Sequence, residues 1–114
     1  MKISCLQENL IKGLSRVQRA VSNRTTLPVT QNVLLETEQG KIKLVATNLE
    51  IAITSWIPAR IDEPGSITVP ARLFTDLVNS LPPKQIDIES TEDPLGIKIT
   101  SEKVESQLNG LDPS

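Results

Sequence analysis

Residues 33–47, VLLETEQGKIKLVAT, carry the clearest structural pattern in the chain. Apolar and polar side chains alternate on both sides of Gln39-Gly40, a pair that favours a tight turn. The stretch therefore predicts an antiparallel hairpin of two strands, residues 33–38 and 41–47. Because alternating strands give a sheet one buried and one solvated face, we expect helices to cover the buried face.

The segments that flank this hairpin show the same order of elements twice. A strand at residues 2–6 and a helix at residues 7–22 precede the hairpin, and a strand at residues 49–57 follows it. The second half then offers a strand at 66–69, a helix at 71–81 and strands at 85–90, 95–101 and 103–108. Each helix has one apolar face, made of Leu10, Leu14, Val17 and Val21 in the first and of Leu73, Phe74, Leu77, Val78 and Leu81 in the second.

This order of elements predicts an α+β fold in a single domain, residues 1–114. We expect two β-α-β-β-β units, residues 1–58 and 59–114, with two helices packed on one face of antiparallel sheets. The 114 residues suffice for one hydrophobic core, and with one Trp, one Phe and no Tyr that core must consist of Leu, Ile and Val.

The composition argues against catalysis within these residues. The sequence has no histidine and one cysteine, Cys5, so it offers no Ser-His or Cys-His pair and no His or thiolate zinc site. Neither of the glycine-rich phosphate-binding motifs, G-x-G-x-x-G and G-x-x-x-x-G-K-[ST], occurs in the sequence. We therefore expect no enzyme activity, no metal and no cofactor, and we interpret Cys5 as a small core side chain. The lone cysteine, with no signal peptide or membrane-spanning run, favours a cytoplasmic protein.

Positive charge is concentrated at the first predicted helix. The chain carries 12 Lys and Arg against 14 Asp and Glu, yet no acid occurs between Glu8 and Glu36. At about 100° per residue, Lys12, Arg16, Arg19 and Asn23 fall within a sector roughly 60° wide, opposite the apolar face. Arg24 extends this stripe beyond the helix. Exposed helices usually mix charges of both signs, so the pattern indicates an anionic partner.

Duplex DNA and an acidic protein both remain candidates for that partner. The stripe lacks a recognition-helix pattern and an aromatic platform for stacked bases, which leaves sequence-independent attraction to phosphate. About four cations predict a salt slope near −3.6 and weak affinity, so DNA binding would need another source of residence time. The alternative is a protein–protein interaction module whose basic helix binds an acidic partner.

Two longer stretches resemble the first domain of bacterial sliding clamps, the β subunit of DNA polymerase III. They are residues 24–53, RTTLPVTQNVLLETEQGKIKLVATNLEIAI, and residues 64–82, PGSITVPARLFTDLVNSLP. The resemblance runs collinearly to LNGLDPS at residues 108–114. It implies a DNA-clamp domain, part of a non-catalytic ring that encircles duplex DNA and tethers the replicative polymerase. Enclosure by the ring would supply the residence time that four phosphate contacts cannot.

The resemblance also implies roles for particular residues. The DNA-facing set is Arg24, Lys12, Arg16, Arg19, Asn23 and Arg72, with Arg24 matching the arginine that precedes T-L-P in the family. Contacts with a second clamp subunit are expected at Leu73, Lys98, Lys103 and Leu108. Further implied partners are other clamp domains and, through later domains of the family, the polymerase and the clamp loader.

Overall fold

Two helices and nine strands make up the described part of the chain. The computed structural model describes residues 1–18, 32–47, 51–92, 94–102 and 104–110. The helices are α1 (Gln7–Val17) and α2 (Ala71–Asn79). The strands are β1 (Lys2–Leu6), β2 (Asn32–Glu38), β3 (Lys41–Thr47), β4 (Ala52–Pro58), β5 (Arg60–Glu63), β6 (Ser66–Pro70), β7 (Gln85–Thr91), β8 (Gly96–Ser101) and β9 (Val104–Asn109).

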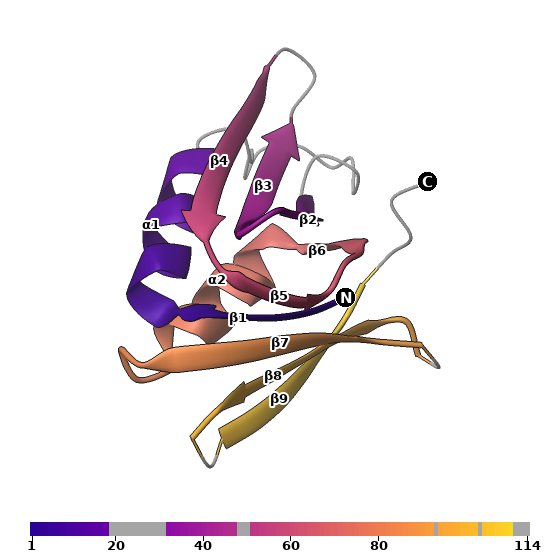
Figure 1. The fold of residues 1–114 in the computed structure, drawn as a ribbon. Helices are drawn as coiled ribbons and strands as arrows, with labels where there is room; N and C mark the ends of the chain where they lie inside the picture. The colour runs from indigo at the N-terminus through magenta and orange to yellow at the C-terminus, as the bar shows by residue number, and fades with distance from the viewer. Residues whose placement is uncertain (19–31, 48–50, 93, 103, 111–114) are drawn as a thin grey trace.

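The strands form two antiparallel sheets, and the strand before each helix joins the strands that follow the other helix. One sheet has the order β4-β3-β2-β6 and the second has the order β5-β1-β7-β8-β9 (Figure 1). Thus β6, which leads into α2, pairs with β2, and β1, which leads into α1, pairs with β7. The predicted hairpin is confirmed, with Glu38 opposite Lys41 and Gly40 at a φ of 72° in the turn. The division into repeats at residues 1–58 and 59–114 stays a prediction.

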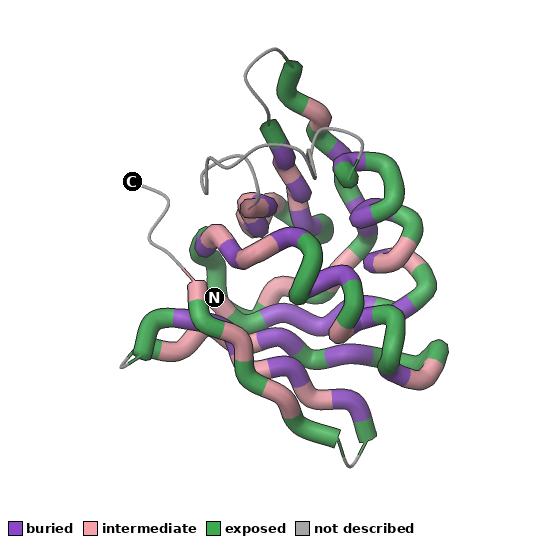
Figure 2. The backbone as a smooth tube through the Cα atoms, turned by 180° about the vertical axis from the view of Figure 1, so that it is seen from behind, coloured by how far each residue is buried: buried purple, intermediate pink, exposed green. Residues whose placement is uncertain are grey.

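A single core joins both sheets and both helices. Its fully buried side chains include Ile3 and Ile88 from one sheet, Leu44 from the other, Leu14 from α1 and Phe74 from α2. Buried and exposed residues alternate along the strands, as Figure 2 shows from the side opposite to Figure 1. Cys5 belongs to this core with 6% exposure, which confirms its interpretation as a core side chain.

Two features position α1 against the rest of the molecule. Gly13 faces β3 and β4 so closely that a Cβ there would lie 2.7 Å from Ile57 Cγ2 and 2.8 Å from Leu44 Cδ1. At the start of α1, the buried Gln7 side chain donates a hydrogen bond of 2.9 Å to the carbonyl of Val78 in α2. The helices therefore pack against each other and against the inner faces of the sheets (Figure 1).

The structure corrects three sequence-based expectations. Residues 60–63 form β5, which was not predicted because prolines flank it on both sides and one residue, Ile61, carries its apolar signal. As an edge strand paired with β1, it tolerates these neighbours. The second helix ends at Asn79 rather than residue 81, although Leu81 is buried. Leu73, expected on its apolar face, is 57% exposed.

None of the helices in the described residues is long and apolar enough to cross a bilayer.

Candidate nucleic-acid interface

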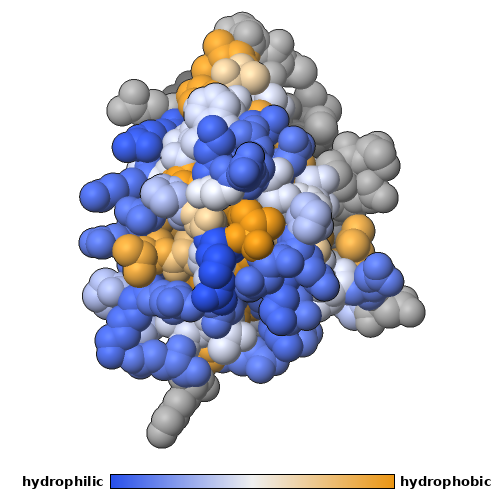
Figure 3. Space-filling view, in the orientation of Figure 1, coloured by the Kyte–Doolittle hydropathy of each residue, from blue (hydrophilic) through white to orange (hydrophobic). Residues whose placement is uncertain are grey.

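The exposed face of α1 presents Lys12 and Arg16. This follows from the helical period, because Leu10, Gly13, Leu14 and Val17 are buried on the opposite side. In the orientation of Figure 1, mostly hydrophilic side chains project from the edge along which α1 runs (Figure 3). The helix thereby holds two of the predicted DNA-facing residues on its solvent side.

The second helix adds Arg72 to this region. Arg72 is exposed in the first turn of α2, where the buried Ala71, Phe74 and Thr75 fix the helix against the core. Because α1 contacts α2, Arg72 belongs to the same helical layer as Lys12 and Arg16. The predicted residues Arg19, Asn23 and Arg24 lie outside the described residues.

The helix cations differ from most of the other described cations in their partners. Among the described residues, five cations form ion pairs with carboxylates at 2.5 to 3.9 Å: Lys41, Lys43, Arg60, Lys84 and Lys98. Within the same ranges Lys12, Arg16 and Arg72 form no ion pair, and neither does Lys2. The charges of the helix cations are therefore not cancelled by neighbouring carboxylates.

Charge is divided between the helices and the rest of the described structure. Residues 7–17 and 71–79 carry three cations and two acids, whereas the other described residues carry six cations and nine acids. The helical layer thus has a positive balance and the sheets and loops have a negative one. On charge alone, the helices are therefore a more favourable side for an anionic partner than the sheets and loops of the described structure.

The residues predicted for a subunit interface occupy α2 and the edge of the five-stranded sheet. Leu73 is exposed on α2, and Leu108 on the edge strand β9 packs partly against the core. Lys98, on the neighbouring strand β8, lies 3.9 Å from the carboxylate of Glu89. Lys103 lies outside the described residues. An exposed leucine and an open strand edge are features that another chain can cover.

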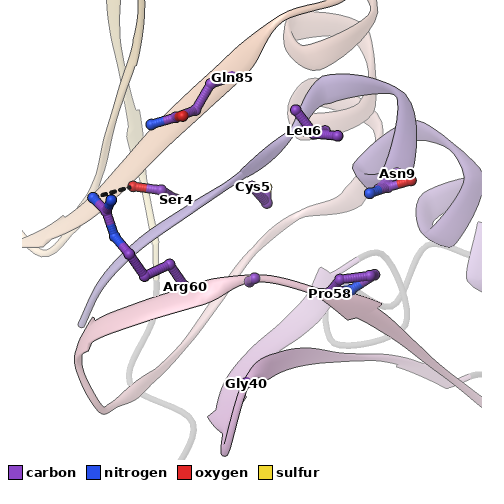
Figure 4. A pocket seen from close by; sticks show the side chains of 9 residues that line it. Ser4, Cys5, Leu6, Asn9, Gly40, Pro58, Arg60 and Gln85 are labelled. Atoms are coloured by element: carbon purple, nitrogen blue, oxygen red, sulfur yellow. Dashed lines mark hydrogen bonds between the residues drawn. The ribbon is translucent and has the colours of Figure 1, made fainter.

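A cavity of about 390 Å³ lies near the start of α1, where Asn9, one turn before Lys12, is among its lining residues (Figure 4). Its nine lining residues include Ser4, Leu6 and Pro58, and Arg60 is the charged one among them. The guanidinium of Arg60 donates a 3.2 Å hydrogen bond to Ser4 Oγ, drawn as a dashed line in Figure 4. This cavity holds no residue of the predicted site.

The wall of this cavity includes Cys5, whose chemistry is that of a buried thiol. Burial, and secondarily the charge of Asp87, raises the pKa of Cys5 from 9.0 to about 12. The thiolate, which is the nucleophilic form, is therefore strongly disfavoured at neutral pH. In the described residues no group of three or more His, Cys, Asp or Glu side chains is arranged to hold a metal ion.

Sequence reasoning missed one residue beside the helix cations. Ser55, on the core-facing side of β4, is 4% exposed and accepts a hydrogen bond of 3.5 Å from Arg16 Nη1. The available signal was a hydroxyl at an inward position of an alternating strand, between Ile53 and Ile57.

Comparison with solved structures assigns the fold to the sliding-clamp class. The chain superposes with a TM-score of 0.92 on a DNA polymerase sliding clamp from Caulobacter crescentus, at 31% identity, covering 99% of this chain and 31% of that one. The clamp from Bacillus subtilis gives a TM-score of 0.91 at 32% identity, with 98% and 31% covered. The fold class predicted from the sequence is thus confirmed.

Sequence comparison then identifies the family. The family model described as "DNA polymerase III beta subunit, N-terminal domain" matches residues 1–114, and the chain belongs to this family. A beta sliding clamp from a Synechocystis strain is 43% identical over 121 residues, with 98% of this chain and 30% of that protein covered. The Bacillus subtilis beta sliding clamp is 33% identical, with 98% and 32% covered. The chain thus spans about a third of the length of these relatives.

Proposed function

We propose that this chain acts as the N-terminal domain of a bacterial DNA sliding clamp, a non-catalytic part of a ring around duplex DNA. The observation that carries the proposal is the set of unpaired cations Lys12, Arg16 and Arg72 on two helices that pack together. Membership of the clamp family supports it. In this role the ring tethers the replicative polymerase, and the chain works beside the chromosome in the cytoplasm.

The proposed contact is with the phosphate backbone and not with the bases. Lysine and arginine side chains without carboxylate partners attract phosphate irrespective of sequence, and each neutralised phosphate adds about −0.9 to the salt slope. The stripe predicted from the sequence contains four cations, Lys12, Arg16, Arg19 and Arg24, and about four such contacts give a slope near −3.6. Contacts this weak allow the ring to move along DNA, while enclosure prevents escape.

The remaining partners follow from the same role. We assign the contact with a second clamp subunit to Leu73, Lys98, Lys103 and Leu108, because an exposed leucine and the edge strand β9 are open to pairing. Other clamp domains complete the ring. The polymerase and the clamp loader bind later domains of the family in this proposal.

The test compares how two charge-matched triple variants bind a short duplex, with NMR titration as the measurement. The first, K12Q/R16Q/R72Q, removes the helix cations; the second, K41Q/K43Q/K98Q, removes as many cations from the strands. We expect the helix variant to lose duplex binding and the strand variant to retain it. Equal losses would show that net charge alone matters, contradicting the proposal. Tighter binding of a poly-glutamate peptide than of duplex would favour the acidic-partner alternative.

A further inference from the structure

Ser55 occupies a position where the strand pattern calls for an apolar side chain. Strand β4 points Ile53, Ser55 and Ile57 toward α1 and the core, and Ser55 is 4% exposed. A buried hydroxyl is costly unless it finds a hydrogen-bond partner. The partner of Ser55 is the guanidinium of Arg16, at 3.5 Å from Nη1 to Oγ.

The packing of α1 brings this pair together. Because Gly13 has no side chain, the helix lies directly on β3 and β4, and a Cβ at Gly13 would be 3.8 Å from Ser55 Oγ. Arg16 comes three residues later and reaches back to the strand from the exposed edge of the helix. Its remaining guanidinium N–H groups stay available, since arginine carries five donors.

The chemistry of the acceptor distinguishes Arg16 from the strand cations. Lys43 lies 3.3 Å from the carboxylate of Glu36, and Arg60 lies 3.3 Å from that of Asp62, so a negative charge offsets each of these cations. The hydroxyl of Ser55 is neutral. It can fix the direction of the Arg16 guanidinium while leaving its full charge for an external anion.

We infer that Ser55 is a positioning residue for Arg16, which holds the guanidinium in place for a DNA phosphate without neutralising it. This inference rests on the proposed DNA-binding function and assigns different roles to two of the DNA-facing cations. Lys12 forms no ion pair among the described residues, whereas the guanidinium of Arg16 is oriented by Ser55 before DNA arrives. Less side-chain freedom is then lost on binding, which strengthens the contact.

The test is a double-mutant cycle in duplex binding with R16Q, S55A and their combination, and with S55T as the conservative control. We expect R16Q to reduce the magnitude of the salt slope by about 0.9, the share of one phosphate contact. S55A should lower the association constant roughly twofold to tenfold, the range for the entropy lost in ordering one long side chain on binding. In the R16Q background S55A should have no further effect, and S55T, which keeps the hydroxyl, should retain wild-type binding. Equal effects of S55A with and without Arg16 would overturn the inference.

A second readout separates this inference from the proposed function. The side-chain Nε–H signal of Arg16, followed by NMR relaxation without DNA, should report an ordered side chain in the wild type and a mobile one in S55A. Unchanged order in S55A would overturn the positioning role even if R16Q weakens DNA binding. Increased mobility in S55A together with unaltered binding by R16Q would instead refute the DNA role of Arg16. Urea denaturation of each variant verifies that the fold is intact.

Discussion

Replacing Gly13 by alanine tests whether α1 is seated as closely as the structure shows. The new Cβ would lie 2.7 Å from Ile57 Cγ2 and 2.8 Å from Leu44 Cδ1. Real Cβ contacts essentially never fall below 3.0 Å, and both neighbours are core side chains, with 3% and 0% exposure. Neither can move into solvent, so the helix or the core must shift.

Two opposing terms set the size of this effect. Alanine in a helix interior is favoured over glycine by about 1 kcal/mol. Overpacking a close-packed core by one methyl group costs about 1–3 kcal/mol. Because both contacts of the new methyl group are too short, we expect the packing cost to be larger. The variant should lose about 1 kcal/mol of unfolding free energy, and Gly13→Val should lose more.

Urea denaturation monitored by circular dichroism measures this difference. Ser15→Ala is the matched control, because Ser15 is exposed on the same helix and gains helix propensity without a clash. We expect the control to be stabilised by a few tenths of a kcal/mol, roughly the difference in propensity. If Gly13→Ala were stabilised by about 1 kcal/mol, as propensity alone predicts, the close approach of α1 to β3 and β4 would be refuted.

Three further predictions concern buried and exposed groups away from Gly13. The pKa of Cys5 rises from 9.0 to about 12 on folding, so its contribution to stability is complete below pH 9 and is lost toward pH 12. The free energy of unfolding should fall by about 1.4 kcal/mol per pH unit in this window. Denaturation measured against pH should show that this loss disappears in Cys5→Val. Ser101 is 1% exposed and its hydroxyl has no hydrogen-bond partner in the described structure. Ser101→Ala should therefore raise the unfolding free energy by about 1 kcal/mol, and a loss of that size would reveal a bond to this hydroxyl. Leu73 is 57% exposed, so Leu73→Asp should change stability by less than about 0.5 kcal/mol. The same variant should abolish co-sedimentation with a second clamp subunit, and retained co-sedimentation would remove Leu73 from the interface.

The hairpin and the helix starts were predictable because local rules determine them. Gln39-Gly40 between alternating segments placed the turn, and the structure pairs Glu38 with Lys41 across it. Residues 7 and 71 were both correct as helix starts. Strand β5 was not predictable, because a four-residue edge strand owes its existence to pairing with the distant β1.

The exchange of β1 and β6 between the two sheets was equally hidden from the sequence. Each strand carries a pattern that fits either sheet, and the choice is made by packing in the whole domain. Leu73 shows the same limit at a single residue. Its helical spacing with Phe74 and Leu77 suggested burial, yet only the position of α2 in the domain decides which side of the helix meets the core.

For the candidate site, the sequence predicted which side of α1 carries the cations, but not which groups the cations of the domain contact. The spacing of Lys12 and Arg16 placed both on the exposed side of α1, as the structure has them. The ion pairs that occupy Lys43 and Lys98 depend on cross-strand register, and the bond from Arg16 to Ser55 depends on how α1 lies on β4. These features emerge when the elements have been assembled.

The most direct test of DNA tracking is chemical-shift mapping of the labelled wild-type domain with a short duplex at low and high salt. We expect shifts confined to residues 12–24 and the surroundings of Arg72, which vanish at high salt. Shifts centred on the outer faces of the sheets, or shifts that persist at high salt, would contradict it.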